Sequence, residues 1–309
     1  MRGRRSRLCS LVLAVTILSG LLAGCSGESP GDKSGALQVA AAFYPIELVA
    51  RRVGGDLVEV TNVTPPGGEP HDLELKPSDV RRIKNADLIL YFAKGFQPAV
   101  DGAVAQLSDR TKAVDLLAGI SLKAPPPGEE EELTVDPHVW LDPTLMQRMV
   151  DMVTEALVKH LPSKRSELRS RATALKSELT ALDGEFTSKL VSCARHEIFT
   201  SHAAFAYLAD RYGLKQVAIT GLSPEAEPSS KRLQEIARKA REAKATTIFF
   251  ETLISPRVSQ AVARIIGAKT AVLDPIEGVE PDAAAKGADY FSIMRQNLAH
   301  LIEALGCTM

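Results

Sequence analysis

The sequence predicts an α/β protein with two lobes, each built on a mainly parallel sheet, bridged by one long helix. Apolar segments of strand length alternate with helical segments through residues 37–161 and again through residues 191–309. Several of the apolar runs are nearly continuous, as in strands that are buried on both faces of a parallel sheet. Between these two lobes, residues 162–190 carry the longest helical periodicity in the chain.

The first 24 residues have the features of a secretory signal. Several arginines precede an apolar run at residues 8–22, which is shorter than the roughly 20 residues of a membrane-spanning helix, so a transmembrane anchor is the weaker interpretation. The segment ends in Leu22-Ala23-Gly24-Cys25, which resembles the lipobox of bacterial lipoproteins. This resemblance implies removal of residues 1–24, lipidation of Cys25 and a lipid anchor in the cell membrane. Residues 25–36 are polar and rich in Gly and Ser, as expected of a flexible tether.

Composition excludes some classes of partner. The chain of 309 residues has a formal net charge of −1, without the basic excess that nucleic-acid binding requires, so we expect no nucleic-acid partner. Outside the signal and the lipobox, the remaining cysteines are Cys193 and Cys307. An exported pair can form a disulfide, although two reduced thiols also fit the sequence. Neither lies in a CxxC pair, which disfavours a thiolate zinc site.

The N-terminal lobe, residues 37–161, alternates strands with helices. Strands are expected at residues 37–43, 58–63 and 88–92 and around Val114, and helices after Pro45 and at residues 77–85 and 143–159. The loop at residues 123–134 contains three prolines followed by four glutamates and cannot bury a core. We interpret it as a solvated acidic loop, and an electrostatic collector of cations is the alternative.

One long amphipathic helix is expected at residues 162–190. Its apolar residues recur at spacings of three and four: Leu168, Ala172, Leu175, Leu179, Leu182, Phe186 and Leu190. At 1.5 Å per residue the helix extends on the order of 40 Å, enough to run along both lobes and join them. Coiled-coil dimerisation is the alternative use of this stripe, but the stripe is short and its residues differ in size. We therefore expect a monomer.

The C-terminal lobe, residues 191–309, repeats the alternation. Strands are expected at residues 197–200, 216–220, 247–250 and 270–273. Helices are expected at about residues 203–212, 229–243, 256–266 with Gly267 as the stop, and 288–305.

Four polar side chains lie in loops suited to a shared site. His71, His202 and Asp274 each follow a predicted strand, and loops of this kind converge beyond the carboxyl ends of the strands in an open α/β sheet. His138 precedes the helix that begins at Pro143. Three imidazoles and one carboxylate suit a divalent transition metal, zinc first. We predict a metal site in the cleft between the lobes.

The other histidines provide a comparison. His160, His196 and His300 lie in helices or before a strand rather than in loops of this type, and we interpret them as structural. Glu251 follows the strand at residues 247–250. It is either a spare ligand or an acceptor that holds one imidazole in a single tautomer.

These residues lie in motifs that resemble the zinc- and manganese-specific substrate-binding lipoproteins of bacterial ABC transporters. The motifs are Pro70-His71-Asp72-Leu73-Glu74, Asp136-Pro137-His138-Val139-Trp140, Ser201-His202-Ala203-Ala204-Phe205 and Leu273-Asp274-Pro275. The resemblance covers essentially the whole mature chain and implies two α/β lobes bridged by one long helix. It also implies the ligand set His71, His138, His202 and Asp274.

The resemblance implies an extracytoplasmic receptor that captures Zn²⁺ and delivers it to an ABC permease without catalysing a reaction. Manganese-type members have Glu at the position of His202, so the imidazole here favours Zn²⁺. Residues 129–132 are acidic where many zinc-specific relatives are rich in histidine, which leaves Mn²⁺ open. A surface adhesin and a zinc hydrolase are the rival functions. The hydrolase needs an open coordination position, which Asp274 closes if it is a fourth ligand.

Overall fold

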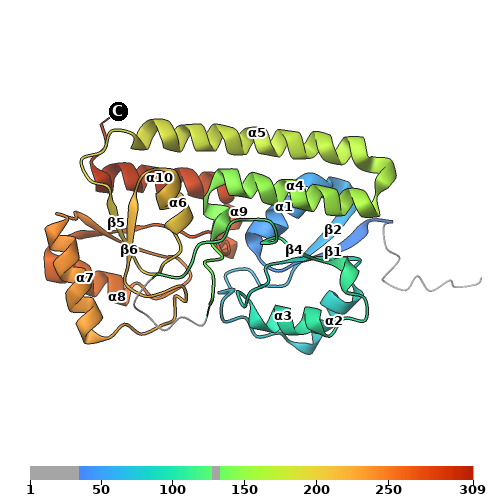
Figure 1. Ribbon diagram of the computed structural model, residues 1–309, viewed down its shortest axis with the longest axis horizontal. Coiled ribbons are helices and arrows are strands. Elements are labelled where there is room, and N and C mark those ends of the chain that lie inside the picture. Colours follow the sequence, from blue (N-terminus) through green and yellow to red (C-terminus); the bar gives the residue numbers. More distant parts are fainter. Residues whose placement is uncertain (1–34, 127–132, 309) are drawn as a thin grey trace, which may run out of the picture. The chain divides into compact units, whose positions relative to one another are not determined.

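The computed structural model describes residues 35–126 and 133–308 as an α/β fold in which every pair of strands is parallel (Figure 1). The predicted α/β class with parallel sheets is confirmed. The predicted signal peptide at residues 1–24, the lipidation site Cys25 and the acidic residues 129–132 lie outside the described residues. Within the described ranges, no helix is both long enough and apolar enough to cross a membrane.

The first half contains a four-stranded sheet. Its strands, in the spatial order β2-β1-β3-β4, are β2 (Val58–Asn62), β1 (Leu37–Ala41), β3 (Leu88–Tyr91) and β4 (Ala113–Asp115). The crossover helices are α1 (Tyr44–Gly54), α2 (Pro77–Asn85) and α3 (Pro98–Ala105). Val39 in the inner strand β1 pairs with Val60 on one side and Leu88 on the other, and all three are buried. α3 is not among the predicted elements because it is short and contains Gly102, which weakens any helical pattern.

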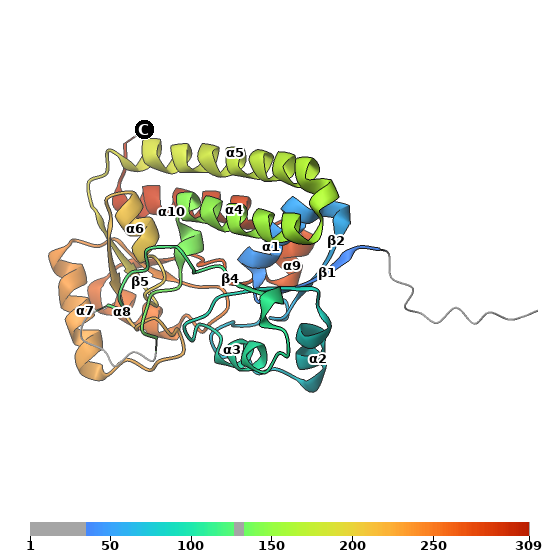
Figure 2. The same cartoon turned by 45° about the vertical axis from the view of Figure 1, so that its right-hand side comes forward.

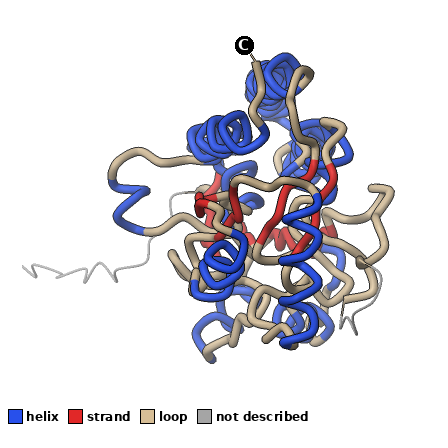
Figure 3. Tube along the Cα trace, turned by 90° about the vertical axis from the view of Figure 1, so that its left-hand side faces the viewer, coloured by secondary structure: helices blue, strands red, loops and turns tan. Residues whose placement is uncertain are grey.

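The second half contains two parallel pairs of strands. The pairs are β5 (Glu197–Thr200) with β6 (Lys215–Ala218), and β7 (Thr247–Phe250) with β8 (Lys269–Val272). The helices are α6 (Ala206–Arg211), α7 (Ser230–Glu242), α8 (Arg257–Ile266), α9 (Pro281–Ala285) and α10 (Tyr290–Leu305). The short α9 is not predicted, whereas α8 ends at Gly267 as predicted, because Gly267 adopts a left-handed φ of 72°. Figure 3 shows the strands flanked by helices.

The long helix α5 (Arg165–Leu190) contains 26 residues, preceded by the 3₁₀ turn η4 (Pro162–Lys164) where the sequence predicts the first helical turn. All seven residues of the predicted apolar stripe are buried, which confirms the amphipathic helix. α5 packs against α1 and α4 (Pro143–His160) of the first half and against α10 of the second half (Figures 1 and 2). Ion pairs join it to both halves: Arg171 to Asp56 at 2.7 Å, and Glu185 to Arg295 at 2.9 Å.

The two halves also share one hydrophobic core, to which both contribute buried residues. Trp140, which is fully buried, packs edge-on against Phe43 of the first half with ring centroids 4.9 Å apart. Its indole N–H donates a hydrogen bond of 2.7 Å to the carbonyl oxygen of Pro275 in the second half. A disulfide joins Cys193, just beyond α5, to Cys307, just beyond α10. The disulfide lies within the second half, whereas the contacts of Trp140 join the loops of the two halves.

Candidate metal centre

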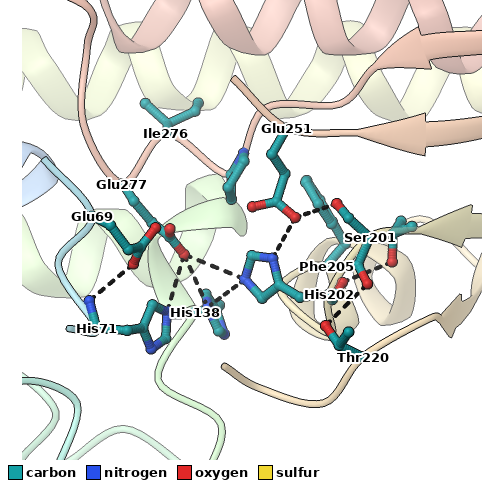
Figure 4. A network of polar contacts seen from close by, with 12 residues as sticks. Glu69, His71, His138, Ser201, His202, Phe205, Thr220, Glu251, Ile276 and Glu277 are labelled. Atoms are coloured by element: carbon teal, nitrogen blue, oxygen red, sulfur yellow. Dashed lines mark hydrogen bonds and ion pairs between the residues drawn. The ribbon is translucent and has the colours of Figure 1, made fainter. Parts of the chain in front are cut away.

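Four buried side chains from four separate loops converge on one point. Their ligating atoms all lie within 4.8 Å of one another: those of His71, His138, His202 and Glu277 (Figure 4). His71 belongs to the loop after β2, and His138 precedes the 3₁₀ turn η3 (Val139–Leu141). His202 follows β5, and Glu277 follows β8. Each half of the chain therefore contributes two of the four groups.

The distances within this cluster fit a tetrahedral metal. The Oε1 atom of Glu277 lies 3.3 Å, 3.2 Å and 3.4 Å from the Nε2 atoms of His71, His138 and His202. The Nε2 atoms of His138 and His202 are 3.3 Å apart. In a tetrahedral site with zinc–ligand bonds of about 2.0–2.1 Å, neighbouring ligand atoms are about 3.3 Å apart. These four separations match that spacing, and all the ligating atoms lie within 4.8 Å of one another.

Asp136 holds the imidazole of His138 in one orientation. Its Oδ1 atom accepts hydrogen bonds from the backbone N–H and from Nδ1 of His138, both at 2.9 Å. Because an ionised carboxylate can only accept, Nδ1 of His138 is the donor to Asp136, and Nε2 is the ring nitrogen that faces the cluster. Asp136 and His138 are both buried, which shields this arrangement from water.

Glu251 plays the same role for His202. Its Oε1 atom accepts from Nδ1 of His202 at 2.6 Å and also accepts a hydrogen bond from the hydroxyl of Ser201 (Figure 4). Nε2 of His202 is thereby left facing the cluster. Glu251 is not among the four groups that converge, and its geometry is that of the tautomer-fixing acceptor, one of the two roles predicted for it.

His71 is placed by its own loop and by an aromatic side chain. Its backbone N–H donates to Oε1 of Glu69 at 2.9 Å, and its ring packs edge-on against Phe96 with centroids 4.7 Å apart. Phe96 is buried and, with Trp140, forms an apolar wall beside the imidazoles of His71 and His138. This wall limits the access of water to the ligand atoms.

Residues 39–304 match the family model of ZnuA, described as zinc-uptake complex component A, periplasmic. The chain belongs to the ZnuA family. It is 35% identical over 297 residues to the high-affinity zinc uptake system protein ZnuA of Bacillus subtilis, which covers 91% of this chain and 90% of that protein. It is 34% identical over 303 residues to the zinc-binding lipoprotein AdcA of Streptococcus pneumoniae. That alignment covers 94% of this chain but only 60% of AdcA, so this chain spans part of that longer relative.

Solved structures of ZnuA-type proteins have the same fold. The Zn(II)-bound ZnuA-like domain of Streptococcus pneumoniae AdcA superposes with a TM-score of 0.76 at 33% identity, covering 88% of this chain and 99% of that one. The laminin-binding protein Lmb of Streptococcus agalactiae, described as bifunctional with adhesin and metal transporting activity, has a TM-score of 0.77 at 30% identity. That match covers 87% of this chain and 99% of Lmb. The comparisons place the chain among zinc-uptake binding proteins.

Burial and charge act in opposite directions on the titrating groups of this ZnuA-type centre. Burial lowers the pKa of His71, and the nearby carboxylate of Glu277 offsets this only in part. Burial also acts to lower the pKa of His202, but the carboxylates of Glu251 and Glu277 outweigh it and raise that pKa well above its usual value. Burial acts to raise the pKa of Glu277, yet the three imidazoles around it hold that pKa well below its usual range. The cluster is thus built around one ionised carboxylate.

The carboxylate that the structure brings to the three imidazoles is Glu277, where the sequence predicts Asp274. The oxygens of Asp274 are engaged elsewhere: Oδ1 accepts from the backbone N–H of Ile276 at 2.7 Å, and Oδ2 accepts from the hydroxyl of Thr252 at 2.9 Å. Burial raises the pKa of Asp274 to about 6. Glu277 lies only three residues after Asp274, so the end of β8 correctly indicated where the carboxylate ligand lies. Which of the two carboxylates faces the imidazoles depends on the turn between them.

The remaining histidines stand outside the centre. His160 and His196 are exposed, and Nδ1 of His300 lies 2.7 Å from the carbonyl oxygen of Val272. None of the three joins the converging group within the part of the chain that the structure describes. All three thus lie outside the centre.

Proposed function

We propose that this ZnuA-family protein binds Zn²⁺ outside the cytoplasm and delivers it to an ABC permease for uptake. The observation that supports this function best is the buried cluster of His71, His138, His202 and Glu277, whose ligating atoms lie within 4.8 Å of one another. Three nitrogen donors and one oxygen donor suit Zn²⁺ better than Mn²⁺, which prefers oxygen ligands. The zinc-related names of the ZnuA and AdcA relatives support the same metal.

We propose binding rather than catalysis. Catalytic zinc sites keep one coordination position for water or substrate, whereas structural and carrier sites are closed by protein ligands. The four protein ligands proposed here would complete a tetrahedral shell. A carrier must nevertheless release its ion. Because each half of the chain supplies two of the four ligands, a small shift of one half would withdraw two ligands from the ion.

The proposed location rests on the signal-like residues 1–24 and the lipobox-like segment that ends at Cys25. We propose that residues 1–24 are removed, that Cys25 is lipidated and that residues 25–36 tether the protein to the membrane as a monomer. The folded part would then consist of lobes at residues 37–161 and 191–309 joined by the helix at residues 162–190. Mass spectrometry of the N-terminal peptide from protein made in a bacterial host tests this: an unmodified N-terminus upstream of Cys25 would contradict it.

Zinc titration tests the ligand set. Protein stripped with a chelator is titrated with Zn²⁺ in competition with a fluorescent indicator, alone and as the His71→Ala and Glu277→Ala variants. Each variant loses a direct ligand, so we expect affinity to fall by more than the roughly 10–100-fold that loss of an outer hydrogen-bond partner costs. His196→Ala, which changes an exposed imidazole, is the matched control and should bind like the unmodified protein.

The same titration separates the two metals. Competition between Zn²⁺ and Mn²⁺ should favour Zn²⁺, and a preference for Mn²⁺ would replace the zinc receptor with a manganese receptor of the same type. If both ligand variants bind Zn²⁺ as tightly as the control, the site assignment fails. The similarity to Lmb supports surface adhesion as a second candidate function, which binding of the purified protein to immobilised laminin tests.

A further inference from the structure

The turn between β8 and Glu277 contains an unusual backbone conformation. Ile276 has a φ of 58°, in the left-handed region that residues other than glycine rarely adopt and that a β-branched side chain disfavours most. Its side chain is fully buried, so the turn is not a solvent-exposed one that could change its conformation freely. Residues persist in such conformations only where the surrounding contacts impose them.

The side chain of Asp274 makes two of the contacts that impose this conformation. Its Oδ1 atom accepts from the backbone N–H of Ile276 at 2.7 Å, which closes a turn of the kind that Asp side chains form with their own backbone. Its Oδ2 atom accepts from the hydroxyl of Thr252 at 2.9 Å, in the loop that follows β7. Both oxygens of this buried carboxylate are therefore used to shape the chain rather than to face the imidazoles.

Two further elements hold the same turn. The side-chain amide of Asn297 in α10 accepts from the backbone N–H of Asp274 at 2.9 Å and donates to its carbonyl oxygen at 2.7 Å. The indole of Trp140 donates to the carbonyl oxygen of Pro275 at 2.7 Å. The backbone on the N-terminal side of Glu277 is thus fixed from three directions. Figure 4 shows the result: the chain turns at Ile276, and the carboxylate of Glu277 points toward the three imidazoles.

We propose that Asp274 is a positioning residue that sets the zinc affinity of the centre by imposing the left-handed turn at Ile276 and so aiming the carboxylate of Glu277. This inference rests on the proposed zinc-binding function. The Oε1 atom of Glu277 lies 3.2–3.4 Å from three Nε2 atoms at once, a placement that a backbone shift of about 1 Å would destroy. Asp274 would act on the metal only through Glu277.

A double-mutant cycle tests this dependence. Zinc affinity is measured by indicator competition for Asp274→Ala and Asp274→Asn, each in the unmodified protein and in the Glu277→Ala background. Asp274→Ala removes the turn and should weaken binding by about 10–100-fold in the unmodified protein. In the Glu277→Ala background it should change affinity less than twofold, because the carboxylate that it aims is gone. Asp274→Asn keeps an oxygen that can accept from Ile276 and should retain most of the affinity.

Asp136→Ala is the matched control, and it should lose zinc affinity in both backgrounds. Asp136 acts through His138, to which it is bound at 2.9 Å, and not through Glu277. Asp136→Ala should therefore weaken binding by a similar factor in both backgrounds. The melting temperature of each metal-free variant shows whether it is folded. If Asp274→Ala does not fold, Asp274→Ser, whose hydroxyl can close a weaker turn of the same type, replaces it in the cycle.

The outcomes separate the inference from the function on which it rests. An unchanged affinity in Asp274→Ala, or an equal loss in both backgrounds, would overturn the positioning role. A loss in Asp274→Asn as large as in Asp274→Ala would also overturn it, because the charge of Asp274 would then act on the metal directly. If Glu277→Ala binds zinc as tightly as the unmodified protein, Glu277 is not a ligand and the proposed ligand set is wrong. This single variant therefore tests the zinc-binding site separately from the role of Asp274.

Discussion

Removing Glu251 should weaken zinc binding without removing a ligand. Glu251 is 3% exposed, and its Oε1 atom accepts from Nδ1 of the fully buried His202 at 2.6 Å. In the zinc-bound protein Nε2 of His202 must face the metal, so Nδ1 must carry the proton. In Glu251→Ala this N–H loses its acceptor in the interior. In the metal-free protein the ring can turn or change tautomer, so the penalty falls mainly on the bound state.

The size of the effect follows from that unpaired donor. A buried donor without a partner costs about 1–3 kcal/mol. With about 1.4 kcal/mol for each factor of ten in affinity, Glu251→Ala should bind Zn²⁺ roughly 5- to 150-fold more weakly. Glu251→Gln retains an oxygen that can accept from Nδ1, so its loss should stay below about tenfold.

The assay is competition with a zinc indicator on chelator-stripped protein at neutral pH. Glu242→Ala is the matched control, because its carboxylate is 62% exposed on α7 and pairs with Arg238 at the surface. Zinc affinity of Glu251→Ala within twofold of the unmodified protein would show that Glu251 does not hold His202 for the metal. A loss in Glu251→Gln equal to that in Glu251→Ala would instead indicate that the carboxylate contacts the metal.

Three predictions concern the scaffold that presents the centre. Leu182 on α5 is fully buried, so Leu182→Ala should lower the free energy of unfolding by about 2–5 kcal/mol in urea titrations. The hydrogen bond from Arg211 lowers the pKa of Asp183 below its ordinary value of 3.8. The stability that this pair adds is therefore present above the ordinary pKa and is lost as the pH falls through the folded pKa, and Asp183→Asn should flatten the acid limb of a stability–pH curve. The disulfide between Cys193 and Cys307 closes a sequence separation of 114 residues, so replacing both with Ser should cost about 2–5 kcal/mol of stability, measured by thermal unfolding.

Each of these has a control. Ser188→Ala on the exposed face of α5 should leave the unfolding free energy within about 0.5 kcal/mol, and an equal effect of both α5 variants would contradict the packing argument. An acid limb unchanged by Asp183→Asn would show that the Arg211 pair adds no stability. If adding a reductant leaves the melting temperature of the unmodified protein unchanged, the disulfide does not stabilise the fold.

Most of the fold follows from local patterns. The apolar stripe of α5 could be identified residue by residue because an amphipathic helix has a fixed period that needs no partner to be recognised. The strands are short, and some of them, such as β6 and β8, mix polar with apolar residues. Their ends are displaced by up to two residues from the predicted bounds. Strand ends depend on the neighbouring strand, which the sequence does not name.

The sequence alone determined the α/β class, the long helix and three histidines in loops beyond or beside the sheets. It could not determine which carboxylate joins those histidines. Asp274 and Glu277 are three residues apart, and which of them faces the imidazoles depends on a left-handed Ile276. That conformation opposes the intrinsic preference of isoleucine and persists because Asp274, Asn297 and Trp140 bond to the surrounding backbone. Two of these groups, Asn297 and Trp140, are distant in sequence, so only the tertiary structure decides which carboxylate faces the imidazoles.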